Sequence, residues 1–250
     1  MTELGTKGKL GIVFALREEA AGLERVLAES RSVVRIRNGN IACLIGQLEV
    51  YAAISGIGKD NCAKAAENLI DSGAQWIISS GFAAALDPVA KVGDVVIADR
   101  IITTDSDRTA YHSDAGLLST LPPPGSNTDF AIYQCNMVSV DRIIASPQQK
   151  RKLFLSTGAG ALDMESYAAA AICSSRGVPF AAIRSISDSA FDSIPDFIIT
   201  LTSIENTWRR LLYIAARPHT WQSICQMRRK TDLAAKNLAD VLGFMLLRMI

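Results

Sequence analysis

Residues 161–190 read ALDMESYAAAAICSSRGVPFAAIRSISDSA, and this stretch decides the fold. Its segment 166–175 is rich in small residues and predicts a helix, which the glycine and proline that follow it end. Residues 180–186 are apolar and predict a strand that is buried on both faces. This strand stops at the polar pair 187–188. A helix that leads directly into a buried strand is a repeating unit of α/β layer folds.

The same alternation of strands and helices is predicted in the part of the chain that precedes this unit. An apolar run at residues 10–16 is followed by helical spacing at 20–27, and the turn at residues 55–58 opens a second helix. The segment 103–130 is rich in Asp, Ser, Gly and Pro and is predicted to be an irregular surface loop. Further strands are predicted at residues 33–36, 41–45 (with Asn38-Gly39 as the turn between these two), 50–54, 76–80, 95–102 and 137–140. The pattern predicts an α/β fold in one domain that spans residues 1–250.

Composition excludes several classes of function. The chain has 250 residues, 49% of them hydrophobic and 20% charged, which is typical of a soluble globular protein. The formal net charge of +1 gives no reason to expect nucleic acid as a partner. The 5 cysteines are dispersed and the 2 histidines lie far apart, so no metal site is expected. No signal-like or membrane-spanning run is found, which makes the cytoplasm the default location.

No cofactor is expected either. The segment SGIGKD at residues 55–60 lacks the glycine spacing of both nucleotide triphosphate and dinucleotide loops.

Beyond about residue 195 the chain is predicted to form a helical C-terminal extension of the domain. Arg217-Pro218 and the basic residues 228–230 are expected to separate three helical stretches there. Two interpretations of the last stretch stay open. Its apolar stripe packs on the core or on a second subunit, or it meets an anionic membrane surface together with the basic residues. The stripe consists of Leu238, Val241, Leu242, Met245 and Leu246.

Five short polar or glycine-containing segments lie where strands end or helices begin. Ligands of open α/β sheets bind at such positions, beyond the carboxyl ends of the strands. Each segment alone has an ordinary structural explanation, such as a helix cap or a tight turn. The five segments are residues 17–19, 55–58, 81–85, 163–165 and 187–188.

Taken together and in this order, the segments resemble the nucleoside phosphorylase and nucleosidase superfamily. The matching residues are GIVFALREEA from position 11, SGIGKDNCAKAA from position 55, and ISSGFAAALDPVAKVGDVVIAD from position 78. The stretch at 161–190, with its paired acids, is the most specific part. The resemblance covers about residues 10–190 and implies a three-layer α/β/α fold with a central, mixed, twisted sheet. It also implies a homodimer or larger homo-oligomer and a nucleoside as substrate.

The resemblance assigns roles to residues at matching positions. It implies that Met164 lies against the sugar and that the Glu165 carboxylate accepts hydrogen bonds from the ribose hydroxyls. Asp188 would donate a proton to N7 of the departing purine, with Ser187 orienting it. That role requires a raised carboxyl pKa, which burial in a closed pocket supplies. Arg184 matches a position with a supporting role.

The attacking group separates the two main branches of the superfamily. Hydrolases place a glutamate after the first strand to activate water, and Glu19 stands at that position. Phosphorylases hold phosphate with an arginine ahead of the glycine turn, where this chain has Ser79 and Ser80. Hydrolysis is therefore predicted, and a phosphate-dependent phosphorylase is the alternative. The bond cleavage would pass through an oxocarbenium-like ribosyl cation.

Some positions depart from the usual hydrolase pattern. Residues 81–85 read GFAAA where the hydrolases usually read GSAGG. Phe82 replaces a hydroxyl residue near the sugar, and Ala83 follows it among the residues expected to contact substrate. Ile143, next to Ile144, stands where a base-stacking phenylalanine is usual, which leaves apolar contact without ring stacking. These departures leave a third possibility open, a nucleoside-binding protein without catalysis.

The C-terminal continuation, together with VDRIIASPQQK from position 140 and GALDMES from position 160, is similar to the hopanoid-biosynthesis-associated branch of the superfamily. In that branch the nucleoside carries a large polycyclic lipid at its 5′ position. The resemblance therefore implies an adenine nucleoside with a bulky 5′ substituent.

Overall fold

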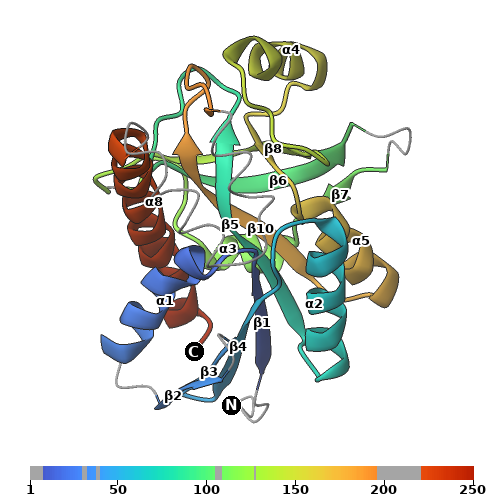
Figure 1. Cartoon of the computed structure of the whole chain (residues 1–250). Helices are drawn as coiled ribbons and strands as arrows, with labels where there is room; N and C mark the ends of the chain where they lie inside the picture. Colours follow the sequence, from blue (N-terminus) through green and yellow to red (C-terminus); the bar gives the residue numbers. More distant parts are fainter. Residues whose placement is uncertain (1–7, 30–32, 38–39, 105–108, 127, 196–220) are drawn as a thin grey trace.

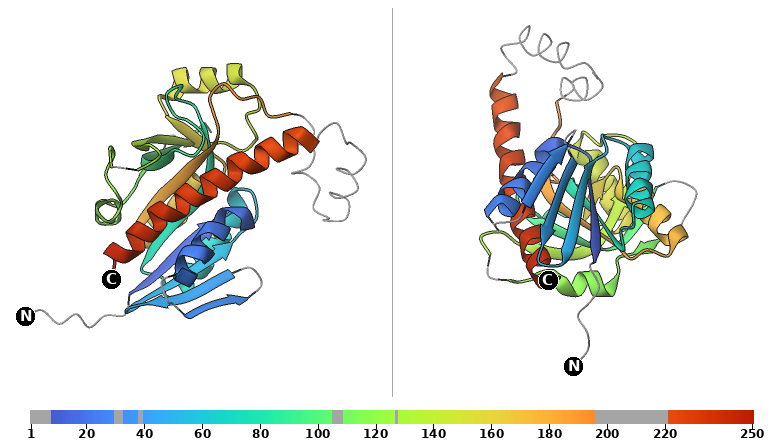
Figure 2. Two further views of the ribbon diagram at one scale, coloured as in Figure 1. Left: turned by 90° about the vertical axis from the view of Figure 1, so that its left-hand side faces the viewer. Right: turned by 90° about the horizontal axis from the view of Figure 1, so that it is seen from below.

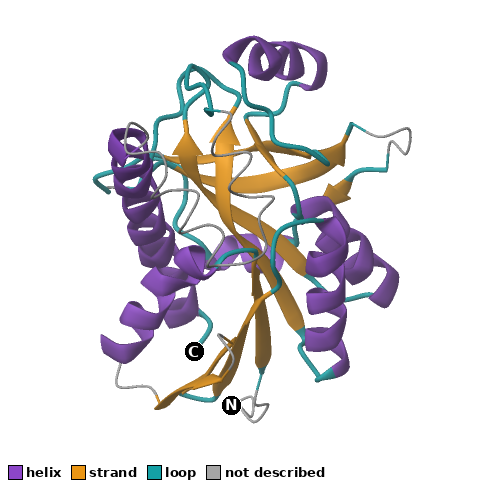
Figure 3. Cartoon of the chain, viewed as in Figure 1, coloured by secondary structure: helices purple, strands orange, loops and turns teal. Residues whose placement is uncertain are grey.

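A computed structural model describes residues 8–29, 33–37, 40–104, 109–126, 128–195 and 221–250. The expected turn at Asn38-Gly39 and the break at Arg217-Pro218 lie outside these residues. The described chain forms one mixed sheet with helices on both faces (Figure 1). Figure 3 shows the strands as the middle layer and the helices on either side of them. The structure therefore confirms the three-layer α/β/α fold.

The strands join in the order β10-β6-β8-β9-β5-β1-β4-β3-β2, and β7 pairs with β6. Because β10 also pairs with β5, the five strands from β10 to β5 close into a ring. The strands are β1 (Lys9–Phe14), β2 (Val33–Arg37), β3 (Asn40–Ile45), β4 (Leu48–Ile54), β5 (Trp76–Ala85), β6 (Val95–Thr103), β7 (Tyr111–His112), β8 (Ile132–Ser139), β9 (Ala161–Asp163) and β10 (Phe180–Asp188).

Two sets of helices cover the two faces of the sheet. On one face α1, α3 and α8 pack over an apolar cluster that includes Phe14, Leu23 and Leu238. On the other face α2 and α5 pack over a second cluster around Ile77 and Met137. The helices are α1 (Arg17–Glu29), α2 (Lys59–Asp71), α3 (Ala115–Thr120), α4 (Pro147–Thr157), α5 (Ser166–Arg176) and α8 (Trp221–Arg248).

The helix α8 lies beside α1 along one face of the molecule (Figure 2). Glycines permit this close approach. A Cβ atom on Gly22 would lie 2.5 Å from the carbonyl oxygen of Ala235, and one on Gly243 would lie 2.8 Å from Val26 Cγ1. The apolar stripe from Leu238 to Leu246 is almost completely buried in the core. Of the two interpretations of this stripe, packing on the core is therefore the one that the structure shows.

Three predictions of secondary structure are wrong. The helix α8 continues through residues 228–230, because lysine and arginine are good helix formers and a run of them does not break a helix. The segment 103–130 contains β7 and α3 and is not irregular throughout. The strand predicted at 76–80 extends to Ala85, because Ala84 and Ala85 pair with β9.

No helix in the described part of the chain is long and apolar enough to cross a bilayer.

Candidate active site

Glu19 lies at the start of α1, directly after β1, with its side chain turned inward. Its Oε2 accepts hydrogen bonds from the backbone N–H groups of Ala15 and Leu16, at 2.9 and 2.8 Å. Its Oε1 accepts one from the N–H of Phe82 at 2.9 Å. Burial raises the Glu19 pKa from 4.5 to about 7, although the N–H groups of Phe82 and Leu16 oppose the shift. A carboxyl with this pKa is suited to accept a proton near neutral pH.

Gly81 gives Glu19 the space that it occupies. At a backbone φ of 151°, a Cβ atom on Gly81 would lie 2.6 Å from Glu19 Oε1 and 2.8 Å from Oε2. Any side chain at this position would therefore displace the carboxylate.

We expect Gly81→Ala to lower kcat at least as much as the loss of a positioned general base, about 100-fold or more. The displaced Glu19 could no longer keep its three backbone contacts. Steady-state kinetics on a purine nucleoside would measure this effect. Gly158→Ala is the control, because its backbone φ of 65° is also positive and gives comparable backbone strain, whereas nothing lies within 4 Å of a Cβ atom there. Unchanged kinetics of Gly81→Ala would show that the position of Glu19 is unimportant.

Glu165 stands at the entrance to α5 and faces the loop that precedes α2. Its Oε1 accepts a hydrogen bond from the N–H of Gly58 at 3.0 Å, and its Oε2 accepts one from Met164 at 3.3 Å. Burial and the neighbouring Asp163 carboxylate raise the Glu165 pKa. Two segments that are 107 positions apart in sequence thus meet at this carboxylate.

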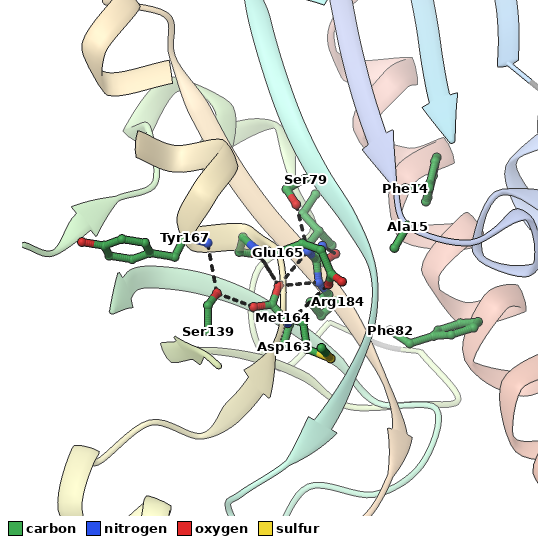
Figure 4. Close-up of polar contacts among 12 residues, drawn as sticks. Phe14, Ala15, Ser79, Phe82, Ser139, Asp163, Met164, Glu165, Tyr167 and Arg184 are labelled. Carbon is green, nitrogen blue, oxygen red and sulfur yellow. Dashed lines mark hydrogen bonds and ion pairs between the residues drawn. The ribbon is translucent and has the colours of Figure 1, made fainter. Parts of the chain in front are cut away.

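Arg184 and Asp163 form a buried ion pair behind Glu165 (Figure 4). Arg184 Nη2 lies 2.7 Å from Asp163 Oδ2, and it also donates to the hydroxyl of Ser79 at 2.8 Å. Asp163 accepts a further hydrogen bond from Ser139 Oγ at 2.5 Å and one from the N–H of Ser166 at 3.1 Å. This network joins strands β5, β8, β9 and β10 to the start of α5. Arg184 is thus held by contacts to Asp163, Ser79 and Ser166.

We expect Asp163→Asn to lower the free energy of unfolding by about 3–5 kcal/mol, because it leaves the Arg184 guanidinium buried without its partner. Both side chains are at most 3% exposed, so solvent screens the pair little. Urea titration of this variant would measure the loss. As a control, Asp71→Asn removes an exposed ion pair to Arg176, and we expect it to leave the free energy of unfolding nearly unchanged, because solvent screens this pair. A small effect of Asp163→Asn would contradict this assignment.

Asp188 ends β10 at a β-bulge, where the register with β5 shifts between Ile186 and Asp188. Its Oδ1 accepts a hydrogen bond from Ser187 Oγ at 3.0 Å, so Ser187 lies where it can orient this carboxylate. Its Oδ2 lies 2.5 Å from Nζ of Lys150, a residue on α4 that is fully buried. The carboxylate for which the sequence predicts burial in a closed pocket is thus paired with a lysine ammonium.

The other residues that were predicted to contact substrate lie at the end of β8, before α5 and on β5. Ile144 and Met164 are partly buried and pack against the same apolar cluster, near the end of β8, and Ile143 is partly buried beside Ile144. Ala83 is buried, and its carbonyl oxygen accepts a hydrogen bond from Ser187 Oγ at 3.3 Å. The Phe82 ring points away from Glu165 and Asp163 (Figure 4). The N–H of Phe82, not its ring, is therefore what meets Glu19.

The sheet brings the carboxylates to one end of the central strands. Glu19 contacts β5 at Gly81 and Phe82. The negative charge of Glu165 also raises the pKa of Glu19. Asp188 pairs with Ala84, three residues further along β5 than Gly81, or about 10 Å at the rise of a strand. Among the described residues, no cluster of three or more His, Cys, Asp or Glu side chains is arranged to hold a metal ion.

Sequence reasoning missed Lys150 as a part of the site, and it placed Asp163 in a candidate segment without giving this residue a role. Lys150 is one of several basic residues in QKRK, and only the structure shows that it alone among them turns inward. Asp163 lies two residues before the N-cap position of α5, Glu165, and accepts a hydrogen bond from the N–H of Ser166. The sequence did not show that the carboxylate of Asp163 balances the positive charge of the buried Arg184.

Comparison with known proteins defines the family. The sequence profile of the Phosphorylase superfamily matches residues 9–207. The chain belongs to this superfamily. The 5′-methylthioadenosine/S-adenosylhomocysteine nucleosidase of Staphylococcus aureus (strain JH9) is 30% identical over 197 residues, which cover 72% of this chain and 86% of that protein.

Solved structures with a similar fold include two that are described as a nucleosidase and a hydrolase. A putative 5′-methylthioadenosine/S-adenosylhomocysteine nucleosidase from Francisella philomiragia superposes with a TM-score of 0.73 at 19% identity, covering 96% of this chain and 99% of that one. Native futalosine hydrolase from Helicobacter pylori superposes with a TM-score of 0.72 at 20% identity, covering 96% and 97%. At these identities the structures support the phosphorylase-superfamily fold alone.

Proposed function

We propose that this phosphorylase-superfamily chain hydrolyses the N-glycosidic bond of a purine nucleoside that carries a 5′ substituent. The observation that carries the proposal is Glu19, a buried carboxyl with a pKa of about 7 that three backbone N–H groups hold at the end of the central strands. Such a group can take a proton from water as the water attacks the ribosyl carbon. The nucleosidase relative from Staphylococcus aureus supports hydrolysis as the reaction.

The remaining roles follow from the positions of the other carboxylates. Glu165 accepts hydrogen bonds from the ribose hydroxyls, Met164 lies against the sugar, and Ile143 and Ile144 provide apolar contact for the base. Asp188 meets N7 of the purine, oriented by Ser187. Arg184 does not contact substrate but fixes Asp163 and the start of α5.

Water, not phosphate, is the proposed nucleophile. Among the described residues, the buried guanidinium that acts electrostatically on both Glu19 and Glu165 belongs to Arg184, which already bonds Asp163, Ser79 and Ser166. It is therefore not free to bind a phosphate ion in the way that a phosphorylase needs.

One assay separates the alternatives. Adenine release is measured from methylthioadenosine, S-adenosylhomocysteine and a 5′-alkyl adenosine, each with and without phosphate. We expect release in phosphate-free buffer at a rate that phosphate does not change. Release only with phosphate would identify a phosphorylase. Measurable binding without release would identify a nucleoside-binding protein.

The finer proposal concerns the 5′ substituent, for which we propose a hopanoid lipid. The chain's similarity to the hopanoid-associated branch supports it. Arg228 and Arg229 are exposed near the start of α8, where they could meet an anionic membrane that carries such a substrate. We expect the 5′-alkyl adenosine to be the best of the three substrates and the protein to bind anionic vesicles at low salt. A preference for methylthioadenosine, with no vesicle binding, would contradict both expectations.

A further inference from the structure

Lys150 is an unusual residue of α4, because a lysine is rarely buried completely. Its neighbours Arg151 and Lys152 are exposed, whereas the Lys150 side chain is 0% exposed. A buried charge is costly unless it is paired and its hydrogen-bonding capacity is satisfied. The ammonium group of Lys150 is therefore expected to have a countercharge and a hydrogen-bond acceptor for each of its N–H groups.

The contacts of the Lys150 ammonium group lie at the last residue of β10 and in the turn that follows it. Its Nζ donates to Asp188 Oδ2 at 2.5 Å, to the carbonyl oxygen of Ser189 at 2.7 Å and to that of Asp192 at 3.2 Å. These three contacts use all three N–H donors of the ammonium group. The same turn is held from its other side, because the Asp192 carboxylate pairs with Lys230 of α8 at 2.8 Å.

The ion pair between Lys150 and Asp188 bears on which group supplies the proton that the leaving base takes. The carboxylate of Asp188 is in an ion pair and, unless it is protonated, has no proton of its own to give. The adjacent ammonium has one, and it is 2.5 Å away. We propose that Lys150 is a positioning residue that supplies, through Asp188, the proton that the departing purine takes. This inference rests on the proposed function, in which Asp188 meets the base.

The step balances without a further reactant. The bond between the ribosyl carbon and the base nitrogen breaks, and its electron pair enters the purine. N7 takes a proton from Asp188, while Asp188 takes one from Lys150 Nζ. The lysine is left as a neutral amine, Asp188 remains a carboxylate, and the purine leaves as a neutral molecule. Water attacks the ribosyl carbon and gives its proton to Glu19, and exchange with solvent then returns a proton to Lys150.

The first test compares leaving groups. A purine needs a proton to leave, whereas 4-nitrophenolate leaves readily as an anion. We expect Lys150→Met to slow adenine release by about 100-fold or more, and to slow cleavage of a 4-nitrophenyl riboside by less than about tenfold. Lys152→Met, on the exposed side of the same helix, should change neither rate. Equal slowing of both substrates by Lys150→Met, or no slowing of either, would overturn the proposal.

The second test asks whether charge alone suffices. Arginine keeps the positive charge but does not give up a proton in proteins. We therefore expect Lys150→Arg to release adenine as slowly as Lys150→Met, and restored activity would overturn the proposal. If either variant unfolds, the double variant Lys150→Met with Asp188→Asn removes both charges. It should release adenine at the rate of Asp188→Asn alone, and an additive loss would also contradict the relay.

Failure of the relay and failure of the proposed function are distinguishable. A wild-type protein that releases no base from any purine nucleoside would disprove the function and the relay together. A wild-type protein that releases adenine while Lys150→Met behaves as wild type would disprove only the relay.

Discussion

Replacing Glu19 by glutamine is expected to lower kcat for adenine release by about 100- to 10,000-fold, the usual contribution of a positioned general base. Glutamine has the same size but cannot accept the proton of the attacking water. Its single carbonyl oxygen also cannot satisfy donors on both sides, since the N–H groups of Ala15 and Leu16 face one carboxylate oxygen and that of Phe82 faces the other. Steady-state kinetics on the best nucleoside substrate would measure the loss.

The pH dependence should report the same residue. Glu19 must be ionised to act as a base, and burial raises its pKa to about 7. We therefore expect kcat/KM of the wild-type protein to rise with pH through about 7 and to level off above it. The rise should be absent from the residual activity of Glu19→Gln.

The matched control is Glu18→Gln, because Glu18 is the adjacent glutamate and its side chain is exposed. It should leave both kcat and the pH profile unchanged. Full activity of a folded Glu19→Gln variant would show that another group activates the water. A profile that rises through the ordinary glutamate range near 4.5 would show that the buried state of Glu19 is not the active one.

Asp188→Asn is expected to cause the second large loss, again about 100- to 10,000-fold in kcat, because an amide cannot pass a proton to the leaving base. The same change should also destabilise the fold. It leaves the ammonium of Lys150, which is 0% exposed, with two carbonyl oxygens and no countercharge. Loss of one partner of a buried pair typically costs about 3–5 kcal/mol, and the 18% exposure of Asp188 places this case at or below the lower end.

A second substitution separates these two effects. Adding Lys150→Met to Asp188→Asn removes the unpaired charge, so we expect it to recover most of the lost stability. It should recover none of the lost activity, because the acid that serves the base is still absent. Thermal unfolding and adenine release, measured on both variants, would test this. Recovery of activity together with stability would mean that Asp188 has a structural role only.

The sequence predicted the layers of this fold better than it predicted the strand ends. The segment 166–188 forms a helix and a strand as expected, because small side chains of the helix and the apolar side chains of the strand are buried in the core. By contrast, β5 was predicted to end at Ser80 and extends to Ala85. Its last residues pair with β9, a strand of three residues that is too short to give a periodic signal.

The carboxylates of the site were predictable, whereas their partners were not. Glu19, Glu165 and Asp188 stand at element ends that the alternation of strands and helices locates. The residues that set their chemistry come from distant segments: Gly58 is 107 positions from Glu165, and Lys150 is 38 from Asp188. Which face of α4 turns inward depends on packing against the turn after β10, and the sequence of α4 alone does not encode it.

The central claim is that water attacks the ribosyl carbon. The most direct test is the identity of the sugar product when the wild-type protein acts on a 5′-substituted adenosine in excess phosphate, followed by ³¹P and ¹H nuclear magnetic resonance. We predict the free 5′-substituted ribose, formed with adenine in equal amounts, and no sugar 1-phosphate. Accumulation of the sugar 1-phosphate would contradict the claim and would make phosphate the nucleophile.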